Sequence, residues 1–183
     1  MMNKIFILLD FDRTLADTDQ LKADFDRLLE QGLSQEQAMK KFGHTSQVLE
    51  SRQKYLLPGA NQLLTFLQQQ AIAHGILTYG QADWQQAKIL AAGLADLPVL
   101  ITDQTDKGTL IASWRQASGA YQLPPELGGQ IAEQIMLVDD HDYSFEGLPT
   151  EALGLYCGID PEVKLPANVY RISHLSEIEN YCK

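Results

Sequence analysis

Residues 5–15 read Ile5-Phe6-Ile7-Leu8-Leu9-Asp10-Phe11-Asp12-Arg13-Thr14-Leu15, an apolar run closed by two carboxylates. A short, continuous apolar run is typical of a strand that is buried on both faces, as in a parallel sheet. In an open α/β sheet, ligands bind just outside the carboxyl ends of the strands. The stretch therefore predicts that Asp10 and Asp12 emerge where a binding or catalytic site is expected.

The two aspartates admit more than one role. Asp10 could act as a nucleophile or as a metal ligand, and Asp12, just beyond the strand, could act as an acid and a base. Aspartate is also common in ordinary turns and caps, wherever a strand gives way to a loop. These alternatives stay open on the evidence of this stretch alone.

Similar apolar runs recur along the chain and alternate with stretches of helical spacing. This alternation predicts an α/β fold with a mostly parallel sheet and flanking helices. The expected strands are Ile5–Leu9, Ala73–Thr78, Pro98–Thr102, Ile135–Val138, Ala152–Cys157 and a short one at Val169–Ile172. The expected helices are Gln62–Gln70, Trp84–Ala92, Thr109–Ala117 and Leu175–Tyr181.

One segment, residues 15–57, interrupts this alternation and contains no convincing strand. Its apolar positions predict two or three amphipathic helices around a turn near Gly32. We expect a small helical insert over the carboxyl end of the first strand. The chain would then divide into a core of residues 1–14 and 58–183 and an insert of residues 15–57.

Two later positions are suited to binding phosphate. Thr78 ends an apolar run, and its hydroxyl and the backbone N–H groups of the turn at Gly80 can bind phosphate oxygens. Threonine and glycine end many strands, so this pattern is weak by itself. Lys107 precedes a predicted helix and can neutralise a phosphoryl group, although a lone lysine is more often a solvated surface residue.

Asp139 and Asp140 close the apolar run Ile135–Val138. Two adjacent aspartates beside a separate Asp-x-Asp would repel each other strongly without a hard divalent cation, and Mg²⁺ prefers oxygen ligands. His141 follows them without zinc-type partners at suitable spacing, so we expect it to support the site or to lie at the surface.

The order of these motifs resembles the four motifs of haloacid dehalogenase superfamily phosphatases. The matching elements are Asp-x-Asp-x-Thr at residues 10–14, Thr78, Lys107, and the pair Asp139-Asp140, each at or just past the end of an apolar run. The resemblance extends from Ile5 to about Cys157. It implies a Rossmann-like core with a helical cap inserted after the first strand, in agreement with the position of residues 15–57.

The family pattern implies a role for each matching residue. Asp10 would be the nucleophile and Asp12 the general acid and base. Thr78, Tyr79 and Lys107 would form the phosphate-binding part of the site. Thr78 would bind the phosphoryl oxygens, Lys107 would neutralise charge, and Tyr79 stands where many relatives have Asn. The implied cofactor is Mg²⁺, and the acids implied around it are Asp10, Asp12, Asp139 and Asp140, with Asp140 aligned with the usual direct ligand.

The expected function is Mg²⁺-dependent hydrolysis of a phosphate monoester through an aspartyl-phosphate on Asp10. One alternative is a phosphotransferase or mutase that passes the phosphoryl group to an alcohol. Another is a binding or regulatory member of the fold without turnover, against which the complete motif set counts. Haloacid dehalogenases themselves lack the second aspartate, so Asp12 argues against dehalogenation. The insert is short for this class, which favours an open site for a small or a larger phosphorylated substrate.

Composition excludes several other classes of protein. A formal net charge of −10 and a pI near 4.7 disfavour binding to nucleic acid or to anionic membranes. The early run Ile5–Leu9 is far too short for a signal-peptide core or a membrane span. Cys157 and Cys182 show neither metal-ligand spacing nor a disulfide framework. We therefore expect a cytoplasmic protein, and no residue pattern specifies the alcohol of its substrate or its oligomeric state.

Overall fold

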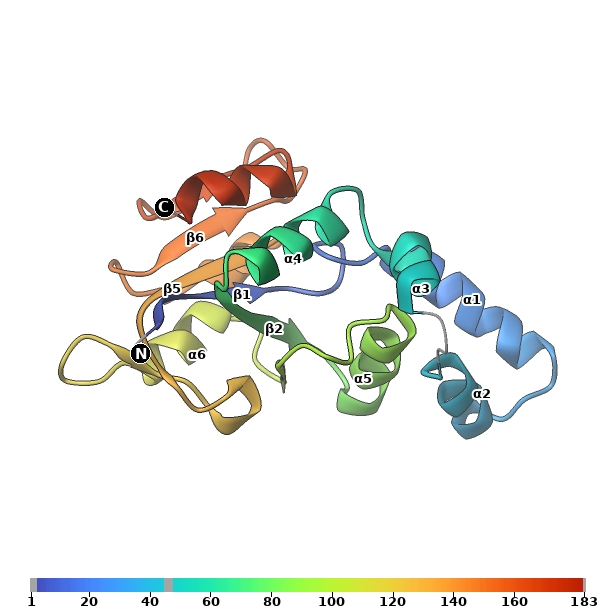
Figure 1. Ribbon diagram of the computed structural model, residues 1–183. Coiled ribbons are helices and arrows are strands. Elements are labelled where there is room, and N and C mark those ends of the chain that lie inside the picture. The colour runs from blue at the N-terminus through green and yellow to red at the C-terminus, as the bar shows by residue number, and fades with distance from the viewer. Residues whose placement is uncertain (1–2, 45–47, 183) are drawn as a thin grey trace.

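A computed structural model describes residues 3–44 and 48–182 of the chain (Figure 1). Within these residues one sheet contains the strands β1 (Asn3–Leu9), β2 (Ala73–Tyr79), β3 (Val99–Thr102), β4 (Tyr121–Gln122), β5 (Ile131–Asp139), β6 (Leu153–Tyr156) and β7 (Val169–Arg171). The strand order is β3-β2-β1-β5-β6-β7, and β4 pairs with β5 alone. All pairs except β4–β5 are parallel. This is the predicted mostly parallel, Rossmann-like sheet.

The described helices are α1 (Thr18–Glu30), α2 (Gln35–Phe42), α3 (Val48–Tyr55), α4 (Ala60–Gln69), α5 (Ala82–Ala91) and α6 (Lys107–Ser113). Three short 3₁₀ helices, η1 (Pro125–Leu127), η2 (Asp142–Phe145) and η3 (Leu175–Tyr181), complete the set in the same residues. None of the helices in the described part of the chain is long and apolar enough to cross a membrane.

The pleat of β1 separates two hydrophobic clusters, because successive side chains of a strand point to opposite faces. Ile7 and Leu9 pack with α4, α5 and η3 on one face of the sheet. Phe6 and Leu8 pack with α6 on the other face. All four side chains are buried, which explains why the run is continuously apolar.

The helices α1, α2 and α3 lie beyond the carboxyl ends of β1 and β2 (Figure 1), where the sequence predicts an insert. Gly32 has a φ of 84° in the turn between α1 and α2. Phe25 of α1 and Phe42 of α2 both contact the Trp84 ring of α5, at centroid distances of 4.6 and 5.8 Å. Since the insert and the core share one apolar cluster, their division at residues 15–57 stays a prediction.

Apart from shifts of one or two residues at the ends of other elements, three details differ from the sequence-based expectations. The helix expected at Thr109–Ala117 begins at Lys107 and ends at Ser113, because the chain then turns to meet β4: the N–H of Gln122 donates to the carbonyl of Trp114. The strand β5 begins at Ile131, ahead of its fully buried part, and pairs there with β4. The closing helix Leu175–Tyr181 is a 3₁₀ helix.

Candidate active site

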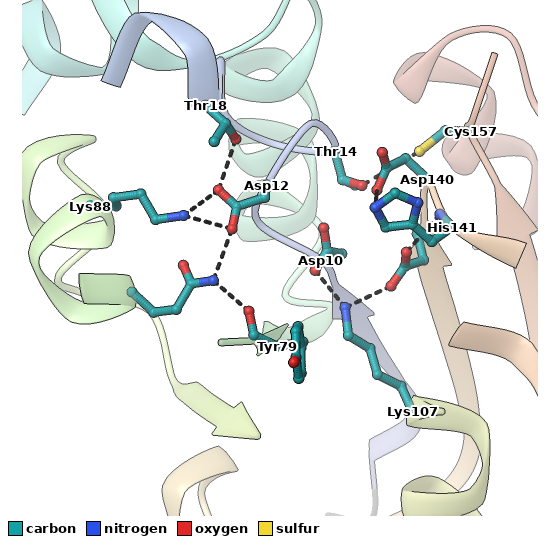
Figure 2. Close-up of polar contacts among 12 residues, drawn as sticks. Asp10, Asp12, Thr14, Thr18, Tyr79, Lys88, Lys107, Asp140, His141 and Cys157 are labelled. Atoms are coloured by element: carbon teal, nitrogen blue, oxygen red, sulfur yellow. Dashed lines mark hydrogen bonds and ion pairs between the residues drawn. The ribbon is translucent and has the colours of Figure 1, made fainter. Parts of the chain in front are cut away.

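Asp10 follows the last residue of β1, and its backbone N–H donates to the carbonyl of Val138 on the neighbouring strand β5. Its carboxylate contacts Lys107, the first residue of α6: Nζ lies 2.5 Å from Oδ1 of Asp10. The same ammonium lies 2.7 Å from Oδ2 of Asp139. Figure 2 shows the Lys107 ammonium beside the Asp10 carboxyl group, and the side chains of Asp10, Lys107 and Asp139 are all buried. The structure therefore brings three of the predicted site residues into direct contact.

Burial dominates the electrostatics of Asp10. It raises the pKa of this carboxyl to about 8, with a further increase from Asp139, although the Lys107 ammonium opposes the shift. For Lys107, burial alone would lower the pKa, but the carboxylates of Asp10 and Asp139 outweigh it and raise the pKa. Lys107 therefore stays protonated, and the site favours the uptake of additional positive charge.

Asp10, Asp139 and Asp140 form an acidic group whose ligand oxygens all lie within 4.8 Å of one another. Oδ1 of Asp140 is buried and accepts no hydrogen bond from the described residues. Burial raises the pKa of Asp140, and Asp139 adds to the increase while His141 opposes it. Two carboxyl groups that share Lys107, and a third with a buried oxygen that has no partner among the described residues, fit a small, hard cation such as Mg²⁺.

The loop after β5 orients this acidic group. The N–H of His141 donates to Oδ1 of Asp139 at 2.9 Å. The His141 ring is half-exposed, with Nε2 3.8 Å from Oδ1 of Asp140, and it stacks on Tyr143 at 4.8 Å between centroids. His141 thus borders the acidic group.

Thr78 lies near the end of β2, next to β1 in the sheet. Its Oγ1 is buried and has no hydrogen-bond partner among the described residues, a costly arrangement for a hydroxyl unless a ligand completes it. The side chain of Tyr79 is 48% exposed, and Gly80 has a φ of 142°. An unpaired hydroxyl at a strand end is suited to a phosphoryl oxygen.

The loop after β1 turns sharply at Arg13, whose φ is 59°, and the N–H groups of Leu15 and Ala16 both donate to the carbonyl of Phe11. Thr14 is buried in this loop, with Oγ1 3.7 Å from Sγ of Cys157. Burial raises the pKa of the Cys157 thiol to about 12. These contacts hold the loop that carries Asp12.

The carboxylate of Asp12 has partners that the sequence did not indicate. It accepts hydrogen bonds from Thr18 Oγ1 at 2.8 Å, from Gln85 Nε2 at 2.8 Å, and from Lys88 Nζ at 2.5 and 2.6 Å. Burial acts to raise the pKa of Asp12, but Lys88, Gln85 and Thr18 together lower it. Among the described residues, the acidic group that could hold a metal does not include Asp12.

A sequence feature could have pointed to Lys88. The residues around it on α5, Ala87, Ile89 and Ala91, are all buried, so a lysine among them needs a buried anion as partner. Gln85 precedes it by three positions and therefore lies on the same helix face.

The arrangement as a whole can be compared with known proteins. No family model matches the sequence, and no curated protein matches it either. Many solved structures do match, and they include haloacid dehalogenase-like hydrolases. The chain shares the fold of these hydrolases. In this chain the fold is a mostly parallel sheet with helices on both faces, and acidic residues lie at the ends of β1 and β5.

Three of these structures illustrate the likeness. YfnB from Bacillus subtilis, a proposed haloacid dehalogenase (HAD) hydrolase whose structure was solved bound to magnesium, is 16% identical to this chain. The match covers 99% of each chain, with a TM-score of 0.57. A HAD phosphatase from Thermococcus onnurineus is 18% identical, with 98% of this chain and 97% of that chain covered and a TM-score of 0.56. A proposed β-phosphoglucomutase from Thermotoga maritima is 14% identical, with 97% of each chain covered and a TM-score of 0.57.

Proposed function

We propose that this protein is a Mg²⁺-dependent phosphatase that hydrolyses a phosphate monoester through an aspartyl-phosphate on Asp10. One observation carries the proposal: a buried carboxyl group at the end of β1 shares a lysine with Asp139, beside a buried oxygen of Asp140 that has no hydrogen-bond partner among the described residues. This arrangement offers a nucleophile, a cation site and a fixed positive charge at one edge of the sheet. The fold shared with a HAD phosphatase agrees with it.

In the first step, a carboxylate oxygen of Asp10 attacks phosphorus and the bond from phosphorus to the leaving oxygen breaks. The leaving oxygen takes that electron pair and receives a proton from Asp12, so an alcohol departs. The hydroxyl of Thr78 donates to a phosphoryl oxygen, and Lys107 offsets the negative charge on the phosphoryl group.

In the second step, Asp12 removes a proton from water, and the water oxygen attacks phosphorus. The bond between phosphorus and the Asp10 oxygen breaks, which returns Asp10 as a carboxylate and releases inorganic phosphate. The ammonium of Lys88 favours the carboxylate form of Asp12, which is the form that this step needs. Asp12 must therefore gain a proton before it can serve in the first step.

We propose Asp10, Asp139 and Asp140 as the ligands of Mg²⁺. Asp12 keeps the acid–base role, because its carboxylate oxygens already accept hydrogen bonds from Lys88, Gln85 and Thr18. When bound, Mg²⁺ supplies positive charge against the phosphoryl oxygens and lowers the repulsion between the carboxylates and the substrate.

The substrate that we propose is a small phosphorylated molecule, with room for a larger one beside the short insert. We place the protein in the cytoplasm, since Cys157 and Cys182 are free thiols and stable disulfides are rare in that compartment.

A phosphotransferase or mutase is the second candidate, because the chain shares its fold with a proposed β-phosphoglucomutase. Such an enzyme passes the phosphoryl group from Asp10 to an alcohol instead of water. An assay with an added alcohol acceptor separates the two: a mutase forms a new phosphate ester, whereas a phosphatase releases phosphate at an unchanged rate.

The proposed function is tested with p-nitrophenyl phosphate and Mg²⁺. We expect phosphate release by the wild type, and loss of turnover to below about 1% in Asp10→Asn, since covalent catalysis depends on that oxygen. Asp83→Asn, which removes an exposed carboxylate of α5, is the matched control and should keep full activity. Intact-protein mass should show a phosphorylated wild type and an unmodified Asp10→Asn variant. Steady turnover by Asp10→Asn would refute the proposal.

A further inference from the structure

Lys88 is a second buried lysine, and it forms an ion pair with Asp12 as Lys107 does with Asp10. Nζ of Lys88 lies 2.5 Å from Oδ1 and 2.6 Å from Oδ2 of Asp12. The lysine side chain is 3% exposed and that of Asp12 is 28% exposed. The two ion-pair systems have no member in common, because Lys107 pairs with Asp10 and Asp139. Asp12 thus has its own counter-charge, supplied from a different helix.

The position of Lys88 is itself determined by packing. Its Nζ lies 5.6 Å from the ring centroid of Phe11 and 5.6 Å from that of Trp84, distances at which a cation is attracted to a ring. Trp84 is packed in turn against Phe25 and Phe42 of the insert. The lysine therefore has little freedom to leave Asp12 for water.

Gln85, one turn earlier on α5, is a second donor to the Asp12 carboxylate from the same helix. Its Nε2 donates to Oδ2 of Asp12 at 2.8 Å and to the carbonyl of Tyr79 at 2.5 Å. The side chain is buried, and a Cβ at Gly80 would lie 2.7 Å from the same nitrogen. The amide thus links Asp12 to the last residue of β2.

We propose that Lys88, assisted by Gln85, is a positioning residue that holds the carboxylate of Asp12 in the orientation needed for proton transfer. The inference rests on the proposed function of Asp12. Lys88 meets both oxygens of Asp12, Gln85 meets one of them, and both donors come from the same rigid helix, so together they fix the rotation of the carboxyl group. Thr18 alone contacts a single oxygen and would leave that rotation free.

The first test compares Lys88→Met and Lys88→Arg with the wild type. Lys88→Met should lower kcat by about 10- to 100-fold, the range seen when a residue that orients a reacting group is lost, while KM changes little. Lys88→Arg keeps the charge and should recover part of kcat. The control is Lys54→Met, because Lys54 pairs with Asp24 at the same 2.5 Å within the insert; its kcat should stay within about twofold of the wild type. An unchanged kcat in Lys88→Met would overturn the inference.

A double-mutant cycle separates positioning from general structural damage. If Lys88 acts through Asp12, then Lys88→Met should cause almost no further loss of kcat in an Asp12→Asn background. Equal losses in both backgrounds would show a merely structural role. Gln85→Leu provides the same cycle if Lys88→Met does not fold, since it removes a neutral donor and leaves the ion pair in place.

A crystal structure of Lys88→Met provides a readout that does not need activity. We expect the Asp12 carboxylate to rotate away from Gln85 or to lose defined density, and an unmoved carboxylate would overturn the inference. If the wild type hydrolyses no phosphate ester, the proposed function fails, and this structure still decides whether Lys88 positions Asp12. If the wild type is active and Asp12→Asn is impaired while Lys88→Met is not, only the inference fails.

Discussion

The ammonium of Lys107 lies 2.5 Å from Oδ1 of Asp10, with both side chains buried at the end of β1. A second buried carboxylate, Asp139, shares this ammonium at 2.7 Å. A buried charge is tolerated when it is paired, and the loss of one partner leaves the other uncompensated. Lys107 therefore contributes to folding as well as to the electrostatics of the site.

Replacement of Lys107 by Met should lower the free energy of unfolding by about 3–5 kcal/mol, the range for breaking a buried pair. Addition of Asp10→Asn to this variant should restore part of the loss, because it removes one of the two buried carboxyl groups that Lys107 contacts. Urea denaturation of the two single variants and the double variant measures this coupling. Strictly additive losses would show that Lys107 and Asp10 do not stabilise each other.

Replacement of Thr78 by Val should separate binding from stability. Valine has the same shape but lacks the buried hydroxyl, which has no hydrogen-bond partner in the described part of the chain, so the melting temperature should stay equal or rise. The inhibition constant of inorganic phosphate should increase about tenfold, since a hydrogen bond to a charged oxygen is lost.

Thr102→Val provides the contrast to Thr78→Val. The Thr102 hydroxyl accepts a hydrogen bond from the N–H of Gln104, so its loss should cost about 1 kcal/mol of stability and leave phosphate inhibition unchanged. A Thr78→Val variant with unaltered phosphate inhibition would show that Thr78 does not contact the phosphoryl group.

The pKa of Asp10 predicts how pH controls stability and the effect of Mg²⁺. This pKa rises from 3.8 to about 8 on burial, so between these values the metal-free folded protein holds a proton that the unfolded chain has released. Its stability should therefore fall as pH rises through this window. Mg²⁺ must displace the same proton, and its stabilising effect should grow with pH.

The predicted growth of the Mg²⁺ effect with pH can be tested by thermal denaturation. Melting temperatures are measured in millimolar Mg²⁺ and in excess EDTA, each at pH 6 and pH 8. The increase with Mg²⁺ should be larger at pH 8. Asp10→Asn has no carboxyl proton at this position. Its melting temperature should therefore increase less with Mg²⁺ and the increase should depend less on pH. Equal increases at both pH values in the wild type would contradict the assignment of Asp10 to the cation site.

Replacement of Asp12 by Asn should slow both half-reactions, each by the 10²- to 10⁴-fold that is roughly typical of general acid–base catalysis. A nitrophenyl ester needs little protonation as it leaves, so its first step should be less impaired than that of an alkyl phosphate. The variant should then show a burst of nitrophenol, followed by slow phosphate release and phosphorylated Asp10. Rapid-quench kinetics would measure the burst of nitrophenol and the slow phosphate release, and intact-protein mass spectrometry would detect the phosphorylated Asp10. Equal losses for the two esters, without a trapped phosphoenzyme, would exclude Asp12 as the proton carrier.

The sequence by itself was enough to place every strand of the described residues except β4, together with the residues at their ends. The continuous apolar run before Asp10 and the one before Asp139 predict strands buried on both faces, and these two strands are neighbours in the sheet. Because the carboxyl ends of parallel strands share one edge, the pattern predicts that Asp10 and Asp139 lie close together, and in the structure both contact the ammonium of Lys107. Thr78 could be placed at that edge for the same reason.

Only the tertiary structure decided the partners of Asp12. Lys88 lies 76 positions away in the sequence, and its direction depends on how Trp84 packs against Phe25 and Phe42. The tertiary structure also showed that Oδ1 of Asp140 has no hydrogen-bond partner among the described residues. Periodicity determines which side chains are buried, since it follows from local backbone geometry. Which buried charge meets which depends on contacts between helices and loops far apart in the chain, and no local pattern encodes those contacts.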